Sequence, residues 1–209
     1  MTNCIIVTSV VQTTDKPVYH SALRSIYSHQ ERFQQTLETI ESIRKYMPDI
    51  HIFLIECSPP SDWMDQLATK VDQFINLEFN DTVNNHPEKG LGEKILILHA
   101  LDNLKETYQH IYKITGRYVL QDTFDFSKWK NEDSMTFCNT LHYGIADLVH
   151  TFFYSIKLPL YREILESYQA EGGCCIEFFV AEKLKNKMVL IDHIGILARW
   201  SCYDKISIY

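Results

Sequence analysis

Residues 4–11, CIIVTSVV, form a run dominated by apolar and β-branched side chains. A strand with one solvated face alternates apolar and polar side chains, whereas a continuous run is typical of a strand buried on both faces of a parallel sheet. Such a sheet needs a layer of helices on each side. The run therefore predicts a layered α/β fold with residues 4–11 near its centre.

The rest of the sequence alternates strand-like and helix-like segments. Residues 30–48 place Phe33, Leu37 and Ile40 at helical spacing, and Pro48 ends the pattern. Further strands are predicted at residues 51–56, 72–79, 110–115, 134–139, 149–158 and 188–200, the last with a glycine interruption. Further helices are predicted after residues 61 and 92 and at residues 159–169 and 172–186. We expect residues 1–209 to form a single α/β domain, either alone or as a module of a longer protein. Its central sheet should be mixed, mostly parallel and flanked by helices on both faces.

Composition excludes several classes of protein. The formal net charge is −7 and no long run of Lys or Arg occurs, whereas a general nucleic-acid binder carries a basic patch. There is no run of about eighteen apolar residues and no signal-peptide pattern, so we expect no membrane span and a cytoplasmic location. The six cysteines form no Cys-x-x-Cys motif, which favours free thiols in a reducing compartment.

Glycine is missing where two classes of nucleotide-binding protein need it. Dinucleotide-binding folds and related methyltransferases place glycines directly after the first strand, so that the backbone can approach a phosphate. The first glycine here is Gly90, and the sequence contains no GxxxxGKS or GxxxxGKT motif. Neither phosphate-binding arrangement is therefore expected.

Polar residues follow the ends of the first two predicted strands. Thr8, Ser9 and Val10 lie where open α/β sheets bind ligands, so their backbone groups could pair with the edge of a base. Glu56 could accept a hydrogen bond from a ribose hydroxyl or a uracil N–H. The alternatives are that the first three residues merely end a buried strand and that Glu56 caps a turn.

The segment KITGRY places a cation at a third strand end. Side chains alternate along a strand, so Lys113, Thr115 and Arg117 should point to one side until Gly116 breaks the regularity. A guanidinium group binds phosphate oxygens as a planar fork and keeps its charge. We therefore predict that Arg117 neutralises a diphosphate, with Lys113, Thr115 and Gly116 beside it.

The segment KGLGEK precedes a predicted helix. Free N–H groups and the helix dipole at a helix start favour an anion, so Lys89 and Gly90 are candidate phosphate contacts. A solvated turn with ordinary lysines is the alternative.

The order of these segments resembles the GT-A class of nucleotide-sugar glycosyltransferases. The resemblance runs from residue 4 to residue 197 and includes VTSVVQT, IFLIECS, KGLGEK, IYKITGRY, GGCCIE and HIG. KITGRY in particular resembles small enzymes of the chlorella-virus capsid-glycan type, which would place the protein in the host cytoplasm. The resemblance implies a UDP-sugar donor and a glycan or glycoprotein acceptor.

Glu177 is the residue expected to act on the acceptor. GGCCIE places this acid at a helix start within an apolar segment, where burial raises the pKa of a carboxyl group toward the range of a general base. The resemblance also places an acceptor-side acid there. The alternative is a first-turn glutamate that complements the helix dipole. His142, His150 and Tyr154 are further candidate acceptor contacts.

A divalent metal is also expected, although the motif that usually binds it is missing. The segment TGR stands where the resemblance predicts an Asp-x-Asp motif, so the ligands would have to come from elsewhere. Asp122, with His193, is the predicted set, and oxygen-rich ligation suits Mn²⁺ or Mg²⁺. Asp125 is better explained by a turn or a helix cap.

These features together predict a glycosyltransferase that moves a sugar from a nucleotide diphosphate donor to a hydroxyl of a glycan. Glu177 and Arg117 are its predicted catalytic residues. One alternative is a sugar-phosphate nucleotidyltransferase, although VTSVVQTTDKP lacks the glycine-rich loop which that class has after its first strand. Another is a catalytically inactive glycan-binding domain.

Overall fold

The computed structural model describes residues 3–104, 108, 110–129, 135–138, 149–170, 175–184, 187–191, 194–202 and 206–208. Its main sheet has seven strands in the order β3-β2-β1-β4-β7-β6-β8. These strands are β1 (Cys4–Ser9), β2 (His51–Glu56), β3 (Gln73–Asn76), β4 (His110–Thr115), β6 (Met135–Cys138), β7 (His150–Lys157) and β8 (Met188–Ile191). β1 runs parallel to β2 and β4, and β7 runs antiparallel to β4 and β6. The predicted mixed, mostly parallel sheet is confirmed.

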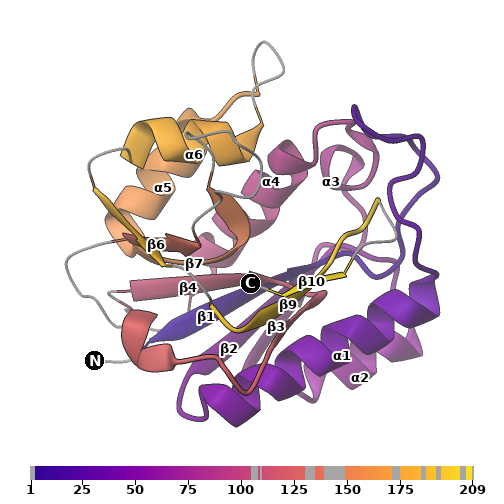
Figure 1. Ribbon diagram of the computed structural model, residues 1–209. Helices are drawn as coiled ribbons and strands as arrows, with labels where there is room; N and C mark the ends of the chain where they lie inside the picture. The colour runs from indigo at the N-terminus through magenta and orange to yellow at the C-terminus, as the bar shows by residue number, and fades with distance from the viewer. Residues whose placement is uncertain are drawn as a thin grey trace.

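Helices cover both faces of this sheet (Figure 1). α1 (His29–Tyr46) and α2 (Asp62–Ala68) lie on one face. α4 (Lys89–Asp102), α5 (Leu158–Ser167) and α6 (Ile176–Leu184) lie on the other, and the short α3 (Asp81–Asn85) precedes α4. No helix in the described ranges combines the length and the apolar character that crossing a membrane requires.

β1 is buried on both faces, as its sequence predicts. Cys4 and Ile6 pack in the core beneath α4, α5 and α6, whereas Ile5 and Val7 pack in the core beneath α1 and α2. All four side chains are fully buried. The regular strand ends at Ser9, two residues earlier than the apolar run suggests.

The strand predicted over residues 188–200, with a glycine interruption, is found as two strands that belong to different sheets. The segment contains β8 of the main sheet and β9 (Ile196–Arg199), which pairs with β5 (Tyr118–Leu120) and β10 (Ile206–Ile208) in a three-stranded sheet. Gly195 has φ +68 and separates the two strands. Its carbonyl accepts a hydrogen bond from Gln121 N (2.8 Å), which places β9 beside β5.

Three distant segments meet near the carboxyl ends of the parallel strands. Residues 10–28 form a long loop after β1. Within it, Tyr19 N donates to Pro87 O (3.2 Å), just before α4, and Ile26 N donates to Ser201 O (2.8 Å), just after β9. The loop therefore joins the start of α4 to the segment after β9.

We predict that Gly195→Ala lowers the free energy of unfolding by more than about 1 kcal/mol, because alanine resists a positive φ. A Cβ there would also lie 2.3 Å from Phe124 N. Denaturant unfolding measures the loss. Glu78→Gly is the matched control, since the exposed Glu78 also has a positive φ (58) and glycine relieves it. Equal stability of Gly195→Ala and the native chain would contradict the prediction.

Candidate functional site

Two adjoining cavities lie at the carboxyl ends of β1 and β4. The first, of about 110 Å³, is called the cationic cavity here, and the second, of about 480 Å³, the aromatic cavity. The cationic cavity is lined by Thr8, Ser9, Val10, Thr13, Arg24, Arg32, Val83, Lys89, Gly92, Glu93, Leu96, Thr115, Arg117 and Ser201. The aromatic cavity is lined by His20, Glu88, Lys89, Gly90, Glu93, Thr115, Arg117, Tyr118, His150, Thr151, Phe152, Cys175, Ile176, Glu177, Phe178, Trp200, Ser201 and Cys202. Lys89, Glu93, Thr115, Arg117 and Ser201 line both, so the two form one continuous site.

Four cations converge on the cationic cavity, although the chain as a whole is acidic. They are Arg24 from the long loop, Arg32 from α1, Lys89 from the start of α4 and Arg117 from the end of β4. In the part of the chain that the structure describes, none of the four forms a salt bridge with a carboxylate. Such a concentration of positive charge in a cleft attracts an anion.

Backbone carbonyls hold the two buried arginines. Arg32 donates from Nε and Nη2 to Val10 O at 2.8 and 2.6 Å, and Arg24 donates from Nη2 to His86 O at 2.5 Å. Each is only 5% exposed. Burial, together with the charge of Arg117, lowers the pKa of Arg32 to about 9. Two buried guanidinium groups are thus fixed at the wall of the cavity by backbone carbonyls, and no described carboxylate forms a salt bridge with either of them.

Lys89 links the long loop to the segment after β9. Its Nζ donates to Arg24 O and to Ser201 Oγ, both at 2.7 Å, and lies 3.1 Å from Cys202 Sγ. Burial lowers the pKa of Lys89 to about 8, and the charges of Arg117 and Arg32 act in the same direction. Its charge is therefore sensitive to whatever occupies the cavity.

Hydrogen bonds hold the end of β4 against β1 and α1. They fix the position of the backbone from which the Arg117 side chain extends. Gly116 N donates to Thr8 O (2.9 Å), and the Thr36 hydroxyl lies 3.1 Å from both Gly116 O and Ser9 Oγ. A Cβ on Gly116 would lie 3.1 Å from Thr36 Oγ1, so the close approach favours glycine. Arg117 Nε is buried without a hydrogen-bond partner among the described residues.

Lys113 is placed differently from the sequence-based expectation. It is fully buried and lines neither cavity. Its Nζ lies 2.5 Å from Glu93 Oε1 and donates to Thr115 Oγ1 (2.8 Å) and Thr151 O (2.7 Å). All the contacts of this ammonium group are thus internal, and the structure gives Lys113 a supporting position behind the site.

Three carboxyl groups line the aromatic cavity, and two of them, Glu93 and Glu177, have described side-chain partners within the site, whereas Glu88 accepts from Gly90 N at the start of α4. Glu177 in the first turn of α6 accepts a hydrogen bond from Thr151 Oγ1 (3.1 Å), and Glu93 in α4 pairs with Lys113. Burial raises the pKa of Glu177, and the charge of Glu93 raises it further. The raised pKa that the sequence suggests for Glu177 therefore has a structural cause. A carboxyl group in this state can accept a proton from a hydroxyl.

Aromatic rings complete the aromatic cavity. Tyr118 stacks on Phe152 with ring centroids 4.8 Å apart, and His150 lies 6.3 Å from Trp200 in an edge arrangement. Flat apolar surfaces beside carboxylates suit the faces and hydroxyls of a sugar ring. Of the other acceptor contacts suggested by the sequence, Tyr154 is buried in the core and His142 lies outside the described residues.

The remaining predicted donor contacts divide into two groups. Thr8, Ser9 and Val10 line the cationic cavity, although Val10 O already accepts from Arg32. Gly90 lines the aromatic cavity, and its N–H is taken by Glu88 Oε1 (2.9 Å).

Glu56 lines neither cavity and is fully buried. Its Oε1 accepts from Val11 N, Cys57 N and Ser58 Oγ. These contacts fit the alternative of a turn-forming acid.

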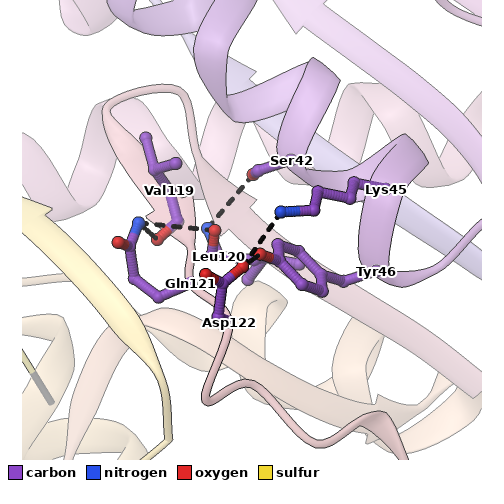
Figure 2. A network of polar contacts seen from close by, with 7 residues as sticks. All are labelled: Ser42, Lys45, Tyr46, Val119, Leu120, Gln121 and Asp122. Atoms are coloured by element: carbon purple, nitrogen blue, oxygen red, sulfur yellow. Dashed lines mark hydrogen bonds and ion pairs between the residues drawn. The ribbon is translucent and has the colours of Figure 1, made fainter.

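Of the two predicted metal ligands, the structure describes only Asp122. Asp122 is exposed and contacts Lys45 Nζ (2.9 Å) and the Tyr46 hydroxyl in a surface network beside α1 (Figure 2). It lines neither cavity, and His193 lies outside the described residues. Asp125 accepts from Ser127 at the start of η1 (Phe126–Trp129), as its turn-forming alternative predicts. Within the described ranges, no group of three His, Cys, Asp or Glu side chains could hold a metal ion.

Three residues of the cationic cavity, Arg24, Arg32 and Glu93, are not indicated by the sequence patterns. Arg24 lies in a loop without periodicity, and Glu93 follows the glycines of KGLGEK. Arg32 carries a weak signal, because a cation near the start of a helix opposes the helix dipole. Its contact with Val10 O, 22 residues away in the chain, explains the position.

Solved structures share this fold. A protein from Desulfovibrio desulfuricans G20 assigned to the nucleotide-diphospho-sugar transferases matches with a TM-score of 0.53 and 8% identity over 92% of this chain and 80% of its own. The glycosyltransferase GlyE of Streptococcus pneumoniae TIGR4 matches with a TM-score of 0.54 and 10% identity over 90% of this chain and 45% of its own. A nucleoside-diphosphate-sugar pyrophosphorylase of Vibrio cholerae RC9 matches with a TM-score of 0.54 and 15% identity over 94% and 95%.

The chain has a GT-A-like fold. No family model and no curated protein matches its sequence. The narrower resemblance to chlorella-virus enzymes stays a prediction.

We predict that anion binding weakens above about pH 8, where the free Lys89 ammonium group loses its proton. A bound anion favours the charged form, so binding must then take up a proton. The affinity for uridine diphosphate, whose phosphates are fully ionised above about pH 7, should fall by up to about tenfold per pH unit. Calorimetric titrations between about pH 7 and about pH 9.5 measure it.

Lys89→Met is the matched variant for this test, because it removes the titrating group. It should bind more weakly at neutral pH and lose most of the alkaline decline. A native affinity that stays flat across the range would contradict the prediction.

Proposed function

We propose that the protein is a glycosyltransferase that moves a sugar from a nucleotide diphosphate donor, UDP-linked, to a hydroxyl of a glycan. The observation that carries the proposal is the junction of the two cavities. A cluster of four cations opens directly onto a cavity with aromatic rings and a carboxyl group of raised pKa. A diphosphate suits the first cavity, and a sugar with its acceptor suits the second.

The donor would lie across the carboxyl end of the sheet. Its base would rest near Thr8 and Val10, which line the cationic cavity at the end of β1, where open α/β sheets bind ligands. Its diphosphate would lie among the four cations, and its sugar would extend past Thr115 and Arg117 into the aromatic cavity, which both residues line. The bond to be broken would then lie where the two cavities join.

Glu177 would act on the acceptor. In an inverting transfer, the acceptor oxygen forms a bond to the anomeric carbon, the bond from that carbon to the diphosphate oxygen breaks, and Glu177 takes the hydroxyl proton. The diphosphate leaves with its negative charge facing Arg117 and Lys89. In a retaining transfer, Glu177 would position the acceptor and stabilise positive charge on the sugar.

A nucleotidyltransferase is the second candidate, because a pyrophosphorylase shares the fold. The glycine-rich loop expected of that class after the first strand would present free backbone N–H groups to the phosphates of the nucleotide. Here Val11 N donates to Glu56 Oε1 (2.9 Å) and Gln12 N donates to Ser58 Oγ (2.9 Å). Two amides of the loop are thus already used, which favours the glycosyltransferase.

We predict that Glu177→Gln keeps UDP affinity and lowers the turnover of a UDP-sugar by roughly a hundredfold or more, as expected for a lost general base. Release of UDP from a panel of UDP-hexoses, with water and with simple glycosides as acceptors, provides the assay. Glu182→Gln is the matched control, because Glu182 is an exposed residue of the same helix. It should leave turnover unchanged.

Other outcomes separate the alternatives. Full turnover in Glu177→Gln would remove this residue from the chemistry. Release of pyrophosphate from UTP and a sugar 1-phosphate, without UDP release from UDP-sugars, would establish the nucleotidyltransferase instead. Nucleotide binding without either reaction would favour an inactive glycan-binding domain.

A further inference from the structure

The resemblance to GT-A glycosyltransferases implies a divalent metal at the end of β4, and the residues there do not suit one. Mg²⁺ and Mn²⁺ prefer several oxygen ligands, carboxylates above all. The strand ends in Thr115, Gly116 and Arg117. Among the described residues, Glu93 is the one carboxylate of the cationic cavity, and it lies 2.5 Å from the buried ammonium group of Lys113. A divalent ion would meet four positive charges and a carboxylate that is already paired.

We propose that the cations of Arg24, Arg32, Lys89 and Arg117 replace a divalent metal in binding the donor diphosphate and in taking up its charge as it leaves. The proposal rests on the proposed function, because it concerns the same leaving group. It assigns to Arg24 and Arg32 a binding role that the strand-end sequence does not suggest.

The charges balance without a metal. A departing nucleoside diphosphate carries roughly three negative charges near neutral pH. The four side chains offer up to four positive charges, and two of them, Arg24 and Arg32, are buried. Burial lowers the pKa of Arg32 to about 9 and that of Lys89 to about 8, so both are charged at neutral pH.

The cluster is also held in place before any ligand arrives. Arg32 is fixed by Val10 O, Arg24 by His86 O, and Lys89 by Arg24 O and Ser201 Oγ. Donors that are already oriented need no rearrangement when charge develops on the leaving group.

Arg117 is the member of the cluster that has a buried hydrogen-bond donor available to a ligand. Its Nε is buried without a hydrogen-bond partner in the described part of the chain, and its guanidinium lies 5.7 Å from the Tyr118 ring centre. It lines both cavities, so it stands where the diphosphate would meet the sugar. A phosphate oxygen would satisfy the buried donor.

The test measures UDP binding to the full chain by calorimetry, once in excess EDTA and once in excess Mn²⁺. We expect the two dissociation constants to agree within about threefold. In EDTA, Arg117→Ala should weaken binding by roughly tenfold to a hundredfold, as for a lost charge-assisted hydrogen bond. Arg117→Lys should lie between, because it keeps the charge and loses the planar fork.

Two control variants lie outside the cavities. Lys45→Ala removes an exposed cation of α1, and Asp122→Asn removes the predicted metal ligand. Both should leave UDP affinity unchanged in either buffer. Circular dichroism of each variant shows whether the fold is kept.

The outcomes separate this inference from the proposed function. UDP binding that requires Mn²⁺, or that is lost in Asp122→Asn, would overturn the inference and leave the glycosyltransferase in place. Binding in EDTA that Arg117→Ala does not weaken would also overturn it. Binding of none of UDP, GDP, CDP and dTDP in either buffer would overturn the proposed function, and the inference with it.

Discussion

The ammonium group of Lys113 is the interaction on which the candidate site depends. It is fully buried, and an ammonium group removed from water without partners costs several kcal/mol. Glu93 in α4, Thr151 in β7 and Thr115 in β4 supply those partners. Because the charge must stay paired, the three elements must keep their relative positions. The Thr151 side chain in turn donates to Glu177, so the same buried charge also positions the carboxyl group at the start of α6.

This pairing also decides the electrostatic character of the cationic cavity. Glu93 lines that cavity and would otherwise offset part of the charge of Arg24, Arg32, Lys89 and Arg117. Its contact with Lys113 turns its charge toward the core. The four cations are left facing a space that suits an anion, although the chain carries a formal net charge of −7. Local packing, rather than overall composition, therefore determines which ligand the cleft attracts.

The sequence predicts the sheet better than it predicts the site, and the reason is physical. The apolar run of β1 requires cover on both faces wherever it is placed, and Arg117 must lie at a strand end if KIT is a strand. The position of Lys113 could not be predicted in the same way. Alternation gives the face of the sheet on which its side chain lies, but not its burial behind Glu93. Arg32 and Arg24 reach the cavity through contacts with carbonyls 22 and 62 residues away. No local pattern encodes such distances.

Burial shifts the pKa values of two groups in the proposed transfer, Glu177 and Lys89, in opposite directions. It raises the pKa of Glu177 and lowers that of Lys89 to about 8, because each charged form loses contact with water. The charge of Glu93 adds to the rise in the pKa of Glu177, and the charge of Arg117 adds to the fall in the pKa of Lys89, whereas hydrogen bonds to Glu177 and the proximity of Cys202 to Lys89 act in the opposite directions. The pH range in which both groups are charged is thus narrowed from both sides. A diphosphate in the cationic cavity would stabilise the Lys89 ammonium and would widen the pH range on its alkaline side, so in the proposed transfer the donor itself would favour the charge state that the reaction requires.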